Sequence, residues 1–175
     1  SVTVTVAFSE KAASPLIPST APAPLLAELT PSPLEPGPHT YAVVSTSELI
    51  DTTPGPWNLQ ALCQARARAG FTPAIVSAEW IHAHYAGPTP ASRIRAFVQD
   101  AYATWGLRYL LLAGTFDLLP VQRLYVSFTD FIYNRTAEIP ADALYFGCLD
   151  GTFDNNGNGR FGEATDGPGG GDVDL

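Results

Sequence analysis

The sequence predicts an α/β fold in which a parallel sheet is layered by helices. The first observation is the stretch 107–114, where the four large apolar residues from Tyr109 to Leu112 do not alternate with polar ones. A strand that is wet on one face alternates, whereas a strand covered on both faces need not. The second observation is that strands and helices alternate from Tyr41 onwards, which favours right-handed crossovers and a parallel sheet. We therefore interpret residues 107–114 as the central strand.

Length and composition suit one domain, or one domain with an appendage. The 175 residues are 46% hydrophobic, which is enough for a core, and no run approaches the ~18 apolar residues of a membrane span. Two cysteines, Cys63 and Cys148, are too few for a disulfide framework. The net charge of −8 is concentrated in residues 138–175, where Arg160 is the single basic residue. This balance argues against nucleic acid as a partner and suits a cation.

Residues 1–38 are predicted to form an N-terminal strand and a proline-rich linker. Residues 2–8 alternate valine or phenylalanine with threonine or alanine, as a half-exposed strand does. Residues 15–38 contain eight of the sixteen prolines, which remove backbone donors and disfavour helix before each ring. We expect an extended linker over a surface, with a helical turn at Leu25, Leu26 and Leu29. The strand either ends a preceding unit or adds to an edge of the sheet.

Residues 39–175 are predicted to form the α/β subdomain, with an acidic loop rich in glycine and asparagine near its C-terminus. In order we expect a strand at 41–45, a turn at 51–56, a helix at 57–69 stopped by Gly70, a strand at 72–76, a helix at 90–105 and the central strand. Thr89 caps the second helix, with Pro90 at its first position and Gly106 as its stop. Residues 115–120 then emerge at the carboxyl edge, where open α/β sheets build their sites.

Several pieces, in order, resemble the gingipain-like cysteine peptidases. They are Tyr41-Ala-Val-Val-Ser45, Arg68-Ala-Gly70, Gly87-Pro-Thr-Pro90, Ile94-Arg-Ala-Phe-Val98, Trp105-Gly-Leu-Arg-Tyr-Leu-Leu-Leu-Ala-Gly114, Leu119-Pro120, Ile139-Pro-Ala-Asp-Ala-Leu-Tyr-Phe146, Leu149-Asp-Gly151 and residues 154–163. The resemblance covers about residues 39–175. It implies a caspase-like first subdomain of a bacterial, secreted or cell-surface hydrolase that cuts peptide bonds in peptides or proteins with a Cys–His dyad.

The chain departs from the pattern of this family in two places. The family usually has Asp directly after the glycine of the central strand, where this chain has Thr115, and Asp117 two residues later is a possible substitute. In the family, the half that carries the catalytic His and Cys lies beyond the position of Leu175. We therefore expect a partner, which is the remaining half of the peptidase domain, as a covalent continuation or a cleaved chain. The end at Leu175 then reflects either proteolytic maturation or truncation.

The cysteines and histidines do not form a dyad in the sequence pattern. Cys63 falls on the buried face of its helix, and Cys148 lies beside acidic residues that raise a thiol pKa, so we interpret both as structural thiols. His82 and His84 share one face in strand geometry and could ligate a metal, but they are interpreted as surface or partly packed residues because no third ligand is near. His39 is interpreted as structural or solvated. The Asn134-Arg-Thr136 glycosylation pattern is short and is discounted.

The best local chemical pattern is the first half of a calcium loop of the Asp-x-Asn-x-Asn-Gly type. Side-chain oxygens recur at alternate positions, and glycines between them permit the tight backbone path. The twelfth position is Thr165, so the loop is not a true EF-hand, and Glu163, Asp166 or Asp150 completes the shell. The expected Ca²⁺ ligands are Asp150, Asp154, Asn156, Asn158, the backbone carbonyl of Arg160, and Glu163. The alternative is a plain surface turn rich in glycine and asparagine.

Two functions of different class follow. In the first, the chain is the non-catalytic N-terminal part of a secreted gingipain-like cysteine endopeptidase. In the second, it is a calcium-stabilised extracellular binding or structural module without peptidase activity.

Overall fold

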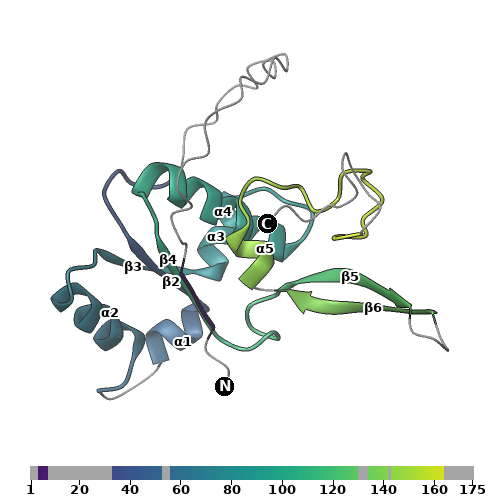
Figure 1. Ribbon diagram of the computed structural model, residues 1–175. Helices are drawn as coiled ribbons and strands as arrows, with labels where there is room; N and C mark the ends of the chain where they lie inside the picture. The colour runs from purple at the N-terminus through teal and green to yellow at the C-terminus, as the bar shows by residue number, and fades with distance from the viewer. Residues whose placement is uncertain (1–3, 8–32, 53–55, 130–133, 142, 164–175) are drawn as a thin grey trace, which may run out of the picture.

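The computed structural model contains a four-stranded sheet with helices on both faces and a separate two-stranded hairpin (Figure 1). It describes residues 4–7, 33–52, 56–129, 134–141 and 143–163. The elements are β1 (Val4–Ala7), β2 (Tyr41–Ser45), α1 (Ser47–Thr52), α2 (Leu59–Arg68), β3 (Pro73–Ser77), α3 (Ala78–His84), α4 (Pro90–Trp105), β4 (Tyr109–Ala113), β5 (Gln122–Thr129), β6 (Asn134–Ala141) and α5 (Ala143–Gly147). No described helix is long and apolar enough to cross a membrane.

The sheet has the strand order β1-β4-β2-β3, and β2, β3 and β4 run parallel to one another. Tyr41 is in register with Pro73 on one side and with Tyr109 on the other. The predicted parallel α/β arrangement is therefore confirmed. The stretch interpreted as the central strand becomes β4, which lies inside the sheet, but the middle of the three parallel strands is β2, whose five residues are all buried. β1 adds antiparallel to β4, so the edge-strand alternative holds for its described residues.

Alternate residues of β2 and β4 serve two separate cores, one on each face of the sheet. Val44 and Leu110 pack on the face covered by α3, α4 and α5. Val43 and Leu111 pack with Cys63 of α2 on the opposite face. This double coverage is the physical reason that neither strand alternates apolar with polar residues.

Helix α4 begins and ends where the sequence predicts. The Thr89 side chain accepts from the Ser92 N–H at 3.1 Å, and the Ser92 hydroxyl accepts from the Thr89 N–H at 3.0 Å, which completes a capping box. Pro90 is the first residue of the helix, and Gly106 closes it with φ of 68°. That left-handed backbone favours glycine because it has no Cβ. The long apolar face of α4 is thus fixed in register over the sheet.

The sequence analysis missed the short elements. A turn was expected at 51–56, but residues 51 and 52 are the end of α1. Residues 53–55 lie outside the described residues. Helices α3 and α5 and the β5–β6 hairpin were not predicted, and β3 begins one residue later than expected. Asn134 starts β6. The helical turn predicted at Leu25, Leu26 and Leu29 and the segment 164–175 also lie outside the described residues.

We expect Thr89→Ala to lower the free energy of unfolding by about 1 kcal/mol, because the first turn of α4 loses its side-chain acceptor. Thr89→Ser keeps the oxygen and is the matched control, which we expect to cost clearly less. Urea denaturation followed by circular dichroism measures both. An equal loss in the two variants would show that the methyl group, and not the cap, matters.

Candidate functional site

The acidic loop 150–163 folds around Asp154, whose carboxylate is satisfied by the backbone of the same loop. Its Oδ1 accepts from the Asn158 N–H and its Oδ2 from the Gly159 N–H, each at 3.0 Å. The Asn156 Oδ1 also accepts from the Asn158 N–H, at 2.9 Å, and the Asn158 Oδ1 accepts from the Arg160 N–H at 2.7 Å. The positive φ of Gly157 and Gly159, 69° and 80°, permits this path. The side-chain oxygens at alternate positions are therefore turned towards the inside of the loop.

Glu163 joins this network from the far end of the loop. The residue is buried, with 9% of its surface exposed, and its two carboxylate oxygens have different partners. Oε2 accepts from the Asn158 Nδ2 at 2.7 Å, while Oε1 lies 2.9 Å from the Arg160 Nη1. The Arg160 guanidinium also lies 4.1 Å from the centre of the Tyr125 ring, in cation–π geometry. The loop is therefore attached to the β5–β6 hairpin by its own arginine.

Five of the six expected calcium ligands, namely Asp154, Asn156, Asn158, Arg160 and Glu163, take part in the hydrogen-bond network of this loop. The sixth, Asp150, has its hydrogen bond elsewhere. Asp150 accepts a hydrogen bond from the Cys148 Sγ at 3.4 Å. Asp166, the other candidate for completing the shell, lies outside the described residues. Within the described ranges, no three His, Cys, Asp or Glu side chains gather as a metal site. The oxygen set consists instead of Asp154 and Glu163 together with asparagine oxygens, a donor chemistry that suits Ca²⁺.

The loop is anchored to the core by Arg95, a buried arginine that the sequence analysis overlooked. Its Nε donates to the carbonyl oxygen of Tyr145 at 3.0 Å, and its Nη2 donates to the carbonyl oxygens of Cys148, at 2.7 Å, and Gly151. The guanidinium also lies over the rings of Tyr145 and Phe153. The sequence feature that indicates a buried Arg95 is its place on the apolar face of α4. Ala91 and Val98, one turn away on each side, are buried.

The two cysteines lie in different environments. Cys63 packs in the core between α2 and the sheet, and burial raises the pKa of its thiol. Burial is also the main cause of the raised pKa of Cys148, and the adjacent Asp150 raises it further. The prediction of a buried Cys63 is confirmed, whereas Cys148 is only half-buried. Both thiols are held in the protonated form, which is the weaker nucleophile.

The histidines are placed away from any common site. His82 and His84 lie on helix α3 and not in strand geometry, so the expectation that they share a face is wrong, because residues two apart on a helix point in different directions. His84 stacks on Trp80, with 4.2 Å between ring centres. His39 packs edge-on against Trp105 at 4.7 Å, as a structural residue does.

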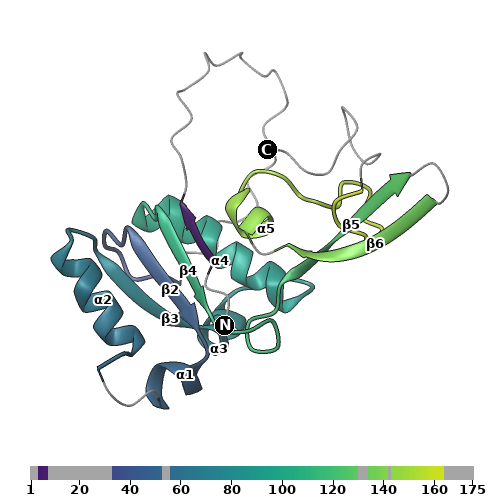
Figure 2. The same cartoon turned by 60° about the horizontal axis from the view of Figure 1, so that its bottom comes forward.

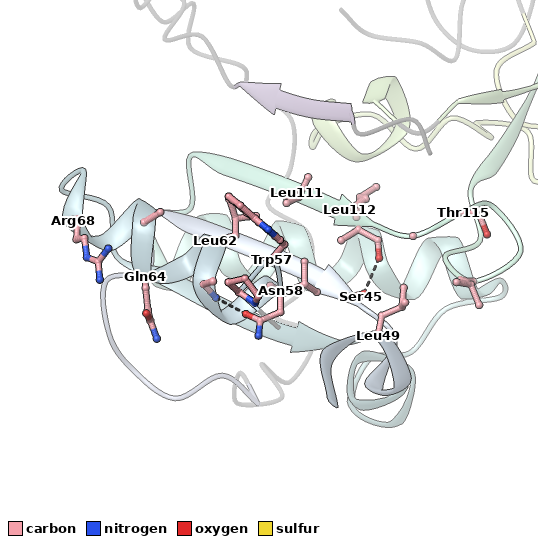
Figure 3. A pocket seen from close by; sticks show the side chains of 17 residues that line it. Ser45, Leu49, Trp57, Asn58, Leu62, Gln64, Arg68, Leu111, Leu112 and Thr115 are labelled. Carbon is pink, nitrogen blue, oxygen red and sulfur yellow. Dashed lines mark hydrogen bonds between the residues drawn. The ribbon is translucent and has the colours of Figure 1, made fainter. Parts of the chain in front are cut away.

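A pocket of about 830 Å³ lies at the carboxyl ends of β2 and β4, beside α2 (Figure 3). Its lining includes Ser45, Gly114 and Thr115, so the expectation that residues just past β4 reach this edge agrees with the structure. The Ser45 hydroxyl donates to the Ala113 carbonyl oxygen at 2.7 Å, which ties the two strand ends together. The remaining walls are mostly apolar. Trp57, at the start of α2, is 90% exposed. Among the described residues that line the pocket, none is a carboxylate, cysteine or histidine, so these residues offer mainly a packing surface.

A three-stranded parallel core with helices on both faces is an α/β arrangement consistent with a caspase-like fold. Among protein families, the model of Peptidase family C25, the gingipain family, matches residues 35–166. The chain therefore belongs to peptidase family C25, and the resemblance seen in the sequence is confirmed. The matched region includes the whole acidic loop. Searches of curated proteins and of solved structures found no match.

We expect Arg95→Met to lower the free energy of unfolding by about 3 kcal/mol or more. It leaves the carbonyl oxygens of Tyr145, Cys148 and Gly151 without their donor, and an unsatisfied buried polar group costs ~1–3 kcal/mol. Arg68→Met, at an exposed position on α2, is the control, with an expected change within ~0.5 kcal/mol. Urea titration measures both, and equal small losses would refute the anchoring role.

Proposed function

We propose that this chain forms the N-terminal, non-catalytic part of a secreted gingipain-like cysteine endopeptidase, whose Cys–His dyad is supplied by residues outside the chain. The observation that carries the proposal is the placement of the two cysteines and three histidines. Cys63 is enclosed on the α2 face of the sheet, and Cys148 donates to a carboxylate. His39 and His84 pack against tryptophans. A nucleophilic thiol needs an adjacent histidine or another group that favours the thiolate, and none of these contacts joins a histidine to a cysteine. The Asp150 carboxylate beside Cys148 raises the pKa of that thiol instead.

The partner in this proposal is the remaining half of the peptidase domain, joined covalently or held as a cleaved chain. The apolar pocket beside α2 supports it, because the exposed Trp57 and Leu118 in its lining offer the kind of surface that a further packed layer covers. The role of this chain is then to position the sheet edge next to a cleft for peptide or protein substrate.

The isolated chain should not hydrolyse a fluorogenic casein substrate in the presence of a thiol reductant. Cys63→Ala should lower the thermal midpoint, because it removes a core side chain, and Cys148→Ala should do so less; neither should change the background rate. Thiol-dependent hydrolysis by the pure chain, abolished by either substitution, would contradict the proposal. The gene beyond the codon for Leu175 is a second test, since a His-Gly and a later Cys at a strand end are expected there.

We also propose that the loop 150–163 binds Ca²⁺. Asp154, Asn156, Asn158 and Glu163 provide hard side-chain oxygens, and the backbone carbonyl of Arg160 is available at the seventh position. The support is a loop already shaped by Asp154 and the asparagines, with their oxygens at alternate positions. The same observation favours the second candidate function, a calcium-stabilised extracellular module without peptidase activity. If the gene beyond Leu175 encodes no Cys–His dyad and calcium still stabilises the chain, the second function is the correct one.

The chain should melt at a lower temperature in chelator than in millimolar calcium. An ion at about ten times its Kd stabilises the folded state by ~1.4 kcal/mol, and extracellular sites have Kd values of ~10⁻⁴–10⁻³ M, so we expect a shift of about 3–6 °C. Asp154→Ala should abolish the shift, while Asp117→Ala, at an exposed carboxylate outside the loop, should retain it. If chelator does not change the melting temperature of the unmodified chain or of either variant, the calcium proposal is wrong and the loop is a plain surface turn.

A further inference from the structure

Strand β3 is an edge of the sheet, and no described strand pairs with its outer side. In the sheet order β1-β4-β2-β3 it pairs only with β2 among the described strands (Figure 2). All five of its residues are half-buried, although the five residues of β2 beside it are fully buried. An exposed edge carries unpaired backbone groups and is a template for another strand.

The register shows which backbone groups face outwards. The Tyr41 N–H donates to the Thr72 carbonyl oxygen at 3.4 Å, and Tyr41 is paired with Pro73. In a parallel ladder, alternate residues then face β2, so Pro73, Ile75 and Ser77 direct their backbone groups to the outside. Pro73 has no N–H, as is common on edge strands. Ile75 therefore offers the one complete outward pair of N–H and C=O in the middle of β3.

A groove of about 640 Å³ borders the carboxyl-terminal half of β3, and its lining includes two acidic residues. Ile75, Val76 and Ser77 contribute one wall, and Ile50 and Trp80 contribute apolar side chains from α1 and α3. The Trp105 Nε1 donates to the Glu35 carbonyl oxygen at 2.9 Å, which fixes Glu35 beside the groove. Helix α1 follows the carboxyl end of β2 and supplies Asp51. Both acidic residues are exposed.

The charge of the groove selects between possible occupants. Among the described residues that line it, Glu35 and Asp51 are charged, and none is a lysine, arginine or histidine. A second copy of this chain, paired antiparallel through Ile75, would bring the same carboxylates face to face, and each copy carries a net charge of −8. An extended segment with a basic residue at each end complements the groove instead. The open backbone groups fix its conformation, because only an extended main chain can pair with them.

We propose that the outer edge of β3 docks an extended, basic-flanked segment of another polypeptide by strand addition. The main chain of that segment pairs with Ile75, alternate apolar side chains enter the groove beside Ile50 and Trp80, and lysine or arginine side chains meet Glu35 and Asp51. Docking here requires neither a Cys–His dyad nor calcium, so it stands or fails independently of the functions proposed above.

The test uses the folded chain and a fluorescein-labelled, end-blocked peptide, Lys-Val-Thr-Val-Thr-Val-Lys, with fluorescence anisotropy as the measurement. We expect saturable binding, and at least tenfold weaker binding of the same peptide with Glu at both ends. Two further peptides are N-methylated, one at the central valine and one at the adjacent threonine. Because alternate residues of a strand face its partner, one of the two should lose at least tenfold in affinity and the other should not.

Variants of the chain locate the binding at this edge. Glu35→Gln and Asp51→Asn should each lower the affinity of the chain for the lysine peptide several-fold, and the effect should be larger at low salt. Glu48→Gln, on the same helix as Asp51 but outside the groove, is the matched control and should leave the affinity unchanged. Equal affinity for the peptide with Glu ends, indifference to both N-methyl groups, or equal effects of all three variants would each overturn the proposal. The proposal would also be overturned if sedimentation experiments show a dimer of the chain that Glu35→Gln strengthens and that does not bind the peptide.

Discussion

The arrangement of the second half of the structure depends on one buried cation. Arg95 is 7% exposed, and a charge in that position is costly unless it is fully hydrogen-bonded. Its guanidinium donates to backbone carbonyl oxygens of the segment 145–151 and lies over two aromatic rings. Carbonyl oxygens are fixed by the path of the chain, so satisfying Arg95 specifies how α5 and the following loop must run. Gln99, one turn further along α4, adds a hydrogen bond to the Leu149 carbonyl oxygen at 2.7 Å.

This constraint extends to the acidic loop. Two residues after Gly151, Phe153 is fully buried and has a φ of 61°, a backbone conformation that costs a bulky residue of order 1 kcal/mol or more. The cost is offset by the contacts of its ring with Tyr145, at 5.2 Å between ring centres, and with Arg95. The turn at Phe153 in turn sets the start of the loop at Asp154. The candidate ion site is therefore connected to the core of α4 through a short series of packed groups.

Features that depend on residues close together in the sequence could be predicted, whereas features that depend on residues far apart could not. Helix α4 shows sixteen residues of periodicity with caps at both ends, so its bounds were predictable. Helices α1 and α3 have six and seven residues, too few for a periodic pattern to emerge. The role of Arg95 was invisible because Tyr145, whose carbonyl oxygen it binds, is 50 positions away. The side-chain oxygens at alternate positions of the loop could be recognised in the sequence because they lie within a few residues of one another.

If calcium binds as proposed, the affinity of the loop for the ion would not be set by its carboxylates alone. Glu163 is already paired with Arg160 and the Asn158 amide, so the loop holds its shape through internal donors. A calcium ion that takes Glu163 as a ligand must displace the Arg160 guanidinium, which can remain stacked on the Tyr125 ring. In the proposed site, the stabilisation by calcium would be the difference between the ion and the arginine as partners of one carboxylate. Arg160 would therefore lower the affinity for calcium, because the ion pair that holds Glu163 in the loop is the one that the ion would replace.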